Sequence, residues 1–209
     1  PGVPEGSDLC ITPVSSPENH YVRIKADNRL EADGTLRGTF TLTAEGQSDS
    51  NIRRIFTTGF QSEWKSTMER QLLTISPKAR LLSVDYGKNP KDYQAAPIKI
   101  TFRYEIPDYA LKGEGEMFFR PMVMNNLYNQ VRSYLRIDTL VENRKYGFKD
   151  GCSRLVELDE MIQLPAGYKL VNAAKNEMMQ GVGADFEGSL TQKGNKVLLH
   201  NRLALKKRV

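Results

Sequence analysis

The chain has 209 residues, of which 39% are apolar and 26% charged, and its net charge is +5. This composition suits one large soluble domain, or two small ones, that can fold without disulfides or metals. No apolar run reaches the roughly 18 residues of a membrane span, and no basic stripe with interleaved aromatics indicates nucleic-acid binding.

Residues 1–19 are rich in proline, glycine and serine, which predicts an irregular lead-in or linker. The chain opens on Pro1 and stops directly after a strand pattern, so we expect a fragment of a longer polypeptide. Residues 20–209 are predicted to form a β-rich domain. A division into two β subdomains near 125–133 is left open.

The first regular pattern is a hairpin. Apolar and polar residues alternate from Val22 to Leu30, and the alternation returns from Leu36 to Ala44. Asp33-Gly34 between the two runs suits a tight turn, because these residue types accept positive φ. Two alternating runs around such a turn predict a β-hairpin.

The apolar period changes after Gly46 to three or four residues, which predicts one long amphipathic helix over residues 49–74. Ser48 or Asp49 is the expected N-cap. We expect the apolar stripe of this helix to pack on one face of a sheet. The stripe consists of Ile52, Ile55, Phe56, Phe60, Trp64, Met68 and Leu72.

Strand patterns fill the rest of the chain. One helix inserted among many strands predicts an α+β fold of mostly antiparallel, β-sandwich-like sheets with the helix on one face. The last strand ends in Lys206-Lys207-Arg208 and is predicted to be a sheet edge protected by charge. The predicted strands after the helix cover 81–84, 98–106, 116–119, 135–139, 153–164, 168–171, 183–190 and 197–205.

A cysteine hydrolase is one functional hypothesis, because a thiolate needs a neighbouring base and the chain offers Cys152 with His200. Cys10 and His20 lie in or beside the irregular lead-in, a poor platform for catalysis. Neither cysteine opens a predicted helix, where activated thiols are common. We favour a solvent-facing His200 and an unreactive loop thiol. Whether Cys10 and Cys152 pair is left open.

Two groups of carboxylates are predicted to be solvated: Glu114 with Glu116, and Glu157, Asp159 and Glu160 on one strand. A glycosidase needs two carboxylates that face each other across a cleft, which one strand cannot supply. We therefore predict no catalytic, cofactor-binding or metal-binding residues in this chain.

A carbohydrate-binding module is a second alternative. Such a module needs a set of exposed, coplanar aromatic rings. The tyrosines that could supply these rings are Tyr86, Tyr93, Tyr104 and Tyr109.

Several short segments together resemble a known family. The resemblance is to the C-terminal β domain that follows a transglutaminase-like, cysteine-protease-type core in bacterial secreted proteins, and it covers most of 20–209. The segments are ENRKY at 142–146, LDEMIQLPAGYKL at 158–170, ADFEG at 184–188, LALKK at 203–207 and the hairpin LEADGTLRGTFTLTAEG at 30–46.

The resemblance implies an exported protein, in the periplasm or at the cell surface of a bacterium. It also implies an upstream core that carries catalytic Cys, His and Asp, for which this chain has no matching positions. We therefore expect a non-catalytic accessory domain. It would position a neighbouring domain of the same polypeptide, or bind a protein or polysaccharide through hairpin loops or an exposed edge strand.

Overall fold

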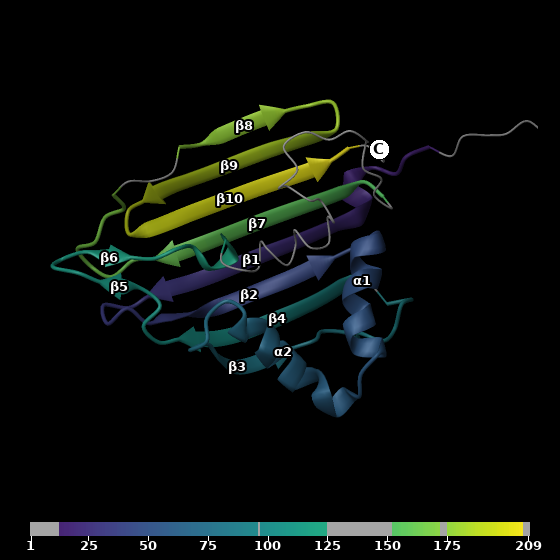
Figure 1. Ribbon diagram of the computed structural model, residues 1–209, viewed down its shortest axis with the longest axis horizontal. Coiled ribbons are helices and arrows are strands. Elements are labelled where there is room, and N and C mark those ends of the chain that lie inside the picture. Colours follow the sequence, from purple (N-terminus) through teal and green to yellow (C-terminus); the bar gives the residue numbers. More distant parts are fainter. Residues whose placement is uncertain (1–12, 96, 125–151, 172–174, 207–209) are drawn as a thin grey trace, which may run out of the picture.

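The computed structural model describes residues 13–95, 97–124, 152–171 and 175–206. Most of its strands form one eight-stranded sheet in the order β3-β4-β2-β1-β7-β10-β9-β8, and β5 and β6 form a separate two-stranded sheet (Figure 1). The strands are β1 (Tyr21–Leu30), β2 (Leu36–Ala44), β3 (Arg80–Asp85), β4 (Ile98–Ile106), β5 (Leu111–Lys112), β6 (Met117–Phe118), β7 (Arg154–Gln163), β8 (Glu177–Gln180), β9 (Ala184–Lys193) and β10 (Lys196–Leu205). The helices are α1 (Gly46–Thr57), α2 (Trp64–Leu73) and the 3-10 helices η1 (Pro17–His20), η2 (Gln61–Glu63) and η3 (Met122–Met124).

The predicted hairpin is confirmed. β1 pairs with β2 in antiparallel register, with Leu30 opposite Leu36 next to the turn and Val22 opposite Ala44 at the far end. Gly34 in the turn has a φ of +90°, which glycine adopts without the steric penalty of a side chain.

The pairing is mostly antiparallel, as predicted, with one parallel pair in the large sheet, β1 with β7. This pair joins two antiparallel blocks, β3-β4-β2-β1 and β7-β10-β9-β8, into one mixed sheet. Parallel neighbours require a long connection, and β1 and β7 lie far apart in the sequence. The sandwich part of the prediction stays a prediction, because the described residues add only the β5–β6 pair to the large sheet.

The predicted edge at Lys206-Lys207-Arg208 is wrong. β10, which ends at Leu205, lies inside the sheet between β7 and β9, and the two edge strands are β3 and β8. Sequence order misleads here, because β10 pairs with β9 on one side and folds back to β7 on the other.

The single long helix is also wrong, because α1 ends at Thr57 and α2 begins at Trp64. The hydroxyls of Thr57 and Thr58 both donate to the carbonyl of Arg54, and Gly59, a poor helix former, follows. Phe60 is extended and 75% exposed, although its spacing placed it on the stripe. The stripe residues buried in the core are Ile52, Phe56, Trp64, Met68 and Leu72.

Among the described residues, helices cover one face of the large sheet and leave the other, here called the open face, uncovered. Along β1, the residues from Val22 to Leu30 alternate between buried and exposed or half-buried positions, as the period-two pattern predicts. The buried face shares a core with α1, α2 and η3. The other face presents charged and polar side chains from β4, β2, β1, β7 and β10.

The remaining predicted segments either differ from the structure or lie outside the residues that it describes. Segment 168–171 is not a strand. The predicted strand 135–139, the division near 125–133 and the ENRKY segment at 142–146 lie outside the described residues. In the part of the chain that the structure describes, no helix has the length and apolar character needed to cross a membrane.

Candidate functional site

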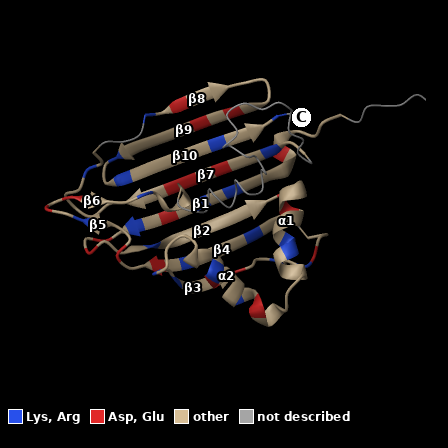
Figure 2. Cartoon of the chain, in the orientation of Figure 1, with Lys and Arg blue, Asp and Glu red and all other residues tan. Residues whose placement is uncertain are grey.

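The open face carries rows of charges that cross its central strands. β7 supplies acidic residues between the basic residues of β1 and β10, as Figure 2 shows. Glu157 on β7 forms ion pairs with Arg23 on β1 and with Arg202 on β10, the latter over 3.6 Å from Nε to Oε1. Cross-strand pairs of opposite charge stabilise a sheet by about 0.2–1 kcal/mol each.

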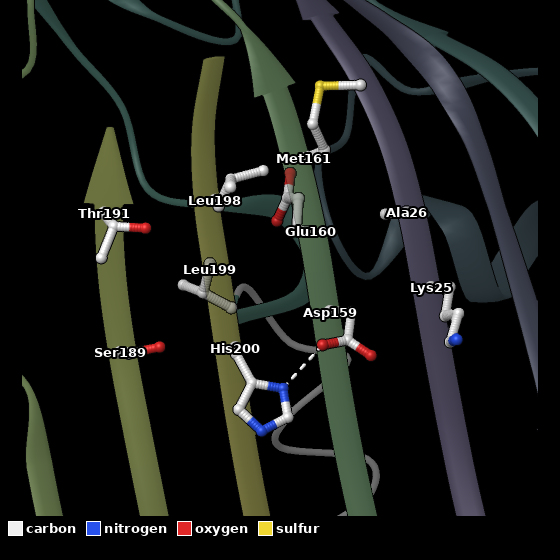
Figure 3. A pocket seen from close by; sticks show the side chains of 10 residues that line it. All are labelled: Lys25, Ala26, Asp159, Glu160, Met161, Ser189, Thr191, Leu198, Leu199 and His200. Carbon is white, nitrogen blue, oxygen red and sulfur yellow. Dashed lines mark hydrogen bonds and ion pairs between the residues drawn. The ribbon is translucent and has the colours of Figure 1, made fainter. Parts of the chain in front are cut away.

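The next row contains the predicted candidate His200. Sheet register aligns Lys25, Asp159, His200 and Ser189 on β1, β7, β10 and β9. The His200 Nδ1 lies 2.6 Å from the Asp159 Oδ1, with side chains 36% and 41% exposed. They line a hollow of about 320 Å³ (Figure 3). Other lining residues are Met161, Thr191 and Leu198.

We call this hollow the polar hollow, after its charged and polar lining residues Lys25, Asp159 and His200. Its geometry suits binding more than reaction. Asp159 orients the imidazole of His200, which turns toward β7 and away from Ser189 (Figure 3). The surrounding backbone belongs to paired strands on both sides, so its N–H groups serve the ladder and cannot form an oxyanion hole. Within the described ranges, no group of three or more His, Cys, Asp or Glu side chains could hold a metal ion.

Cys152 and His200 are not brought together. Cys152 precedes β7, whereas His200 lies opposite Asp159 well along that strand. The part of β7 from Arg154 to Asp159 alone spans about 17 Å at the usual rise per residue, and Cys152 precedes Arg154. A cysteine–histidine pair would need hydrogen-bond distance, so this arrangement gives the thiol no base at His200. Cys10 lies outside the described residues, so whether it pairs with Cys152 stays open.

The four candidate tyrosines do not form a shared exposed platform. Tyr104 is fully buried, with 0% exposure, on the core face of β4. The ring of Tyr86 packs edge-on against Phe56 and Trp64. Tyr109 donates its hydroxyl to the carbonyl of Arg120, and Tyr93 is 54% exposed.

One of the carboxylates expected in solvent lies in the core instead. Glu160 is 2% exposed, and its carboxylate accepts from Asn28 Nδ2 at 2.7 Å and from the backbone N–H of Val123 at 3.0 Å. The hydroxyl of Tyr104 in turn donates to Asn28 Oδ1. Burial raises the pKa of the Glu160 carboxyl and that of the Tyr104 phenol. Through the hydrogen bond from Val123 to Glu160, this network connects η3 to β7 of the sheet.

Gly38 makes the network possible. It lies on β2 between Asn28 and Tyr104, opposite both in register. A β-carbon on Gly38 would overlap Asn28 Oδ1. The missing side chain therefore opens the path across β2 by which Tyr104 reaches Asn28.

The sequence contains a signal for this network that the strand analysis missed. In the alternating pattern of β7, Glu160 falls on the same side as the apolar residues Val156, Leu158 and Ile162. Asn28 stands in the same relation to the apolar residues of β1. A polar residue in phase with a buried face indicates a hydrogen-bonded core group.

The fold and its surface define a mostly β domain with one large mixed sheet, one covered face and one polar face. Residues 115–209, somewhat less than half of the chain, match the family model described as "Domain of Unknown Function with solved-structure structure (DUF3858)". This stretch contains β6, η3 and β7 to β10. No curated protein and no solved structure matches the chain.

Proposed function

We propose that this chain is a non-catalytic accessory module of a larger transglutaminase-like, exported bacterial protein. Its open sheet face would bind a neighbouring domain of the same polypeptide. The observation that carries the proposal is the polar hollow around Asp159 and His200. It combines both signs of charge with hydroxyl groups and an apolar floor, on backbone that is already fully paired.

Two further features support this proposal. Long paired strands hold the charged rows rigidly, so little side-chain and backbone entropy is lost when a partner binds. The sequence segments at 30–46 and 158–170, which carry part of the resemblance to the transglutaminase-associated domain, form the turn after β1 with the whole of β2, and the second half of β7. The open face is thus built partly from the residues that suggest the accessory role.

Met161 in the polar hollow provides a direct test by hydroxyl-radical footprinting with mass spectrometry. We expect Met161 to be oxidised several-fold more slowly in the full polypeptide than in this chain alone. Met178 and Met179, which are 67% and 61% exposed on the edge strand β8, serve as internal references. Equal oxidation of Met161 in both forms would contradict the proposal.

A variant pair sharpens the result. Asp159→Lys reverses a charge in the polar hollow and should restore the oxidation of Met161 in the full polypeptide. Glu69→Lys makes the same charge change on α2 and should leave Met161 protected. If a polysaccharide rather than a domain protects Met161, the partner class changes from a neighbouring domain to a glycan.

A further inference from the structure

A second hollow, of about 430 Å³, adjoins the first on the open face. Three arginines from three neighbouring strands line it: Arg103 on β4, Arg37 on β2 and Arg29 on β1. Leu82 and Gln163 also contribute to its walls. This arginine hollow, named here for Arg29, Arg37 and Arg103, is of the size that small ligands occupy.

Sheet register sets the spacing of these three side chains. Arg29 lies directly opposite Arg37, and Arg103 lies opposite Thr39, which places it diagonally next to Arg37. Like charges directly opposite each other destabilise an antiparallel pair. A bound anion between the guanidinium groups would remove that repulsion.

The arginines keep hydrogen-bond donors available. Arg37 uses Nε to reach Glu105 at 2.7 Å, and Arg29 uses Nε to reach Glu31 at 3.3 Å. Among the described residues, the terminal nitrogens of both have no partner, and Arg103 has no ion pair at all. Guanidinium forks bind phosphate and carboxylate groups in a bidentate manner.

Arg23 and Arg202 flank the carboxylate of Glu157, which neutralises part of their charge. In the arginine hollow the lining carboxylate is Asp27, which lies opposite Thr39 rather than opposite an arginine. Arg37 and Arg29 have carboxylate partners too, Glu105 and Glu31. Arg103 is therefore the lining arginine whose charge no ion pair among the described residues offsets.

We infer that the arginine hollow binds a multivalent oxyanion, either a phosphate group or a cluster of carboxylates. The terminal guanidinium nitrogens of Arg29, Arg37 and Arg103 donate to its oxygens. This site is independent of the proposed domain contact at the polar hollow and does not require it.

The test is calorimetric titration of the whole chain with inorganic phosphate and, separately, with citrate. Arg103→Gln should weaken binding about tenfold, because it removes charge-assisted hydrogen bonds. Asp27→Asn should tighten binding, because it removes the opposing carboxylate. Arg54→Gln, the same change at an exposed position of α1, should have no effect.

The two probes also distinguish the source of the oxyanion. Tighter binding of phosphate indicates a phosphate-bearing ligand, and tighter binding of citrate indicates a polycarboxylate. The inference is overturned if neither probe binds saturably, or if Arg103→Gln and Arg54→Gln weaken binding equally. Unchanged unfolding curves for the variants would show that each effect belongs to the site.

Discussion

At the scale of single residues, Glu160 governs the polar part of the core. Its carboxylate is the common acceptor for the Asn28 amide and the Val123 backbone, and both donors are buried with it. A buried donor that loses its acceptor costs about 1–3 kcal/mol, more than the bond itself contributes. The network is therefore sensitive to any change that removes its acceptor.

Replacing Glu160 with leucine should lower the free energy of unfolding by about 3 kcal/mol or more, because two buried donors lose their partner. Urea unfolding followed by circular dichroism measures this loss. Glu157→Leu, on the open face of the same strand, is the matched control and should cost less than 1 kcal/mol or so. Equal losses would mean that the buried network contributes little.

The raised pKa of Glu160 also predicts a dependence on pH. The folded state holds the Glu160 proton more tightly than the unfolded state does. The resulting stabilisation is complete below the ordinary glutamate pKa and is lost as the pH rises through the folded-state pKa. Glu160→Gln cannot titrate, so wild type should lose stability relative to this variant as the pH rises. A constant difference across that range would refute the raised pKa.

At the scale of elements, α1 begins in an unusual way. Its N-cap, Glu45, makes no side-chain cap, and the backbone N–H of Gln47 instead donates to Nδ1 of His20 at 3.1 Å. Ser48, an expected cap, donates its hydroxyl to the carbonyl of His20. Gly46 has a φ of +61° and lies so close to His20 that a β-carbon would overlap the ring. His20 thus caps α1 from η1.

This capping predicts that the contribution of His20 to stability falls in mild acid. Burial lowers the pKa of His20, and the nearby charge of Arg154 lowers it further. Near pH 6.5 or so, the unfolded state therefore binds more protons. The stabilisation is present above that pH and falls as the pH drops below it. Melting temperatures measured between about pH 8 and pH 5.5 should show this decline in wild type relative to a variant without His20, in which Glu160 still titrates.

The two histidines supply matched variants for that measurement. His20→Gln should flatten the decline, because the group that titrates is gone. His200→Gln retains His20 and should keep the decline. If His200→Gln flattened the curve instead, the pH dependence would originate on the open face.

The elements also show what local pattern can and cannot predict. Period-two alternation located β1, β2, β4 and β7 because one face of each is buried. The break between α1 and α2 depends on local hydrogen bonds of threonine side chains, which leave the apolar spacing unchanged. Apolar spacing alone therefore read two helices as one.

At the scale of the whole molecule, the partner of each strand is the part that sequence pattern left undetermined. Hairpins such as β9–β10 follow from a short turn, but the parallel contact of β1 with β7 joins segments with no local link. The polar hollow shares this origin, since Lys25 and Asp159 become neighbours only through that contact. His200 and Asp159 could be singled out from the sequence, but their place in one row with Lys25 and Ser189 could not.

The same contact predicts that the stretch matched by the family model does not fold by itself. Residues 115–209 contain β7 without β1, so Leu158 and its neighbours would lose the strand beside them. We expect the isolated stretch to give a poorly dispersed NMR spectrum without a cooperative melt. Adding residues 13–114 as a separate chain should restore both. A cooperative melt of the isolated stretch would show that β1 is dispensable.

Timing during synthesis adds a consequence of the β1–β7 contact. More than a hundred residues separate Leu30 from Arg154, and a ribosome that adds about 5–20 residues per second needs on the order of ten seconds to deliver them. Meanwhile the nascent β1–β2 hairpin exposes one unpaired edge of β1 to other chains. That strand carries three basic residues, Arg23, Lys25 and Arg29. Their charge discourages aggregation until β7 has been synthesised.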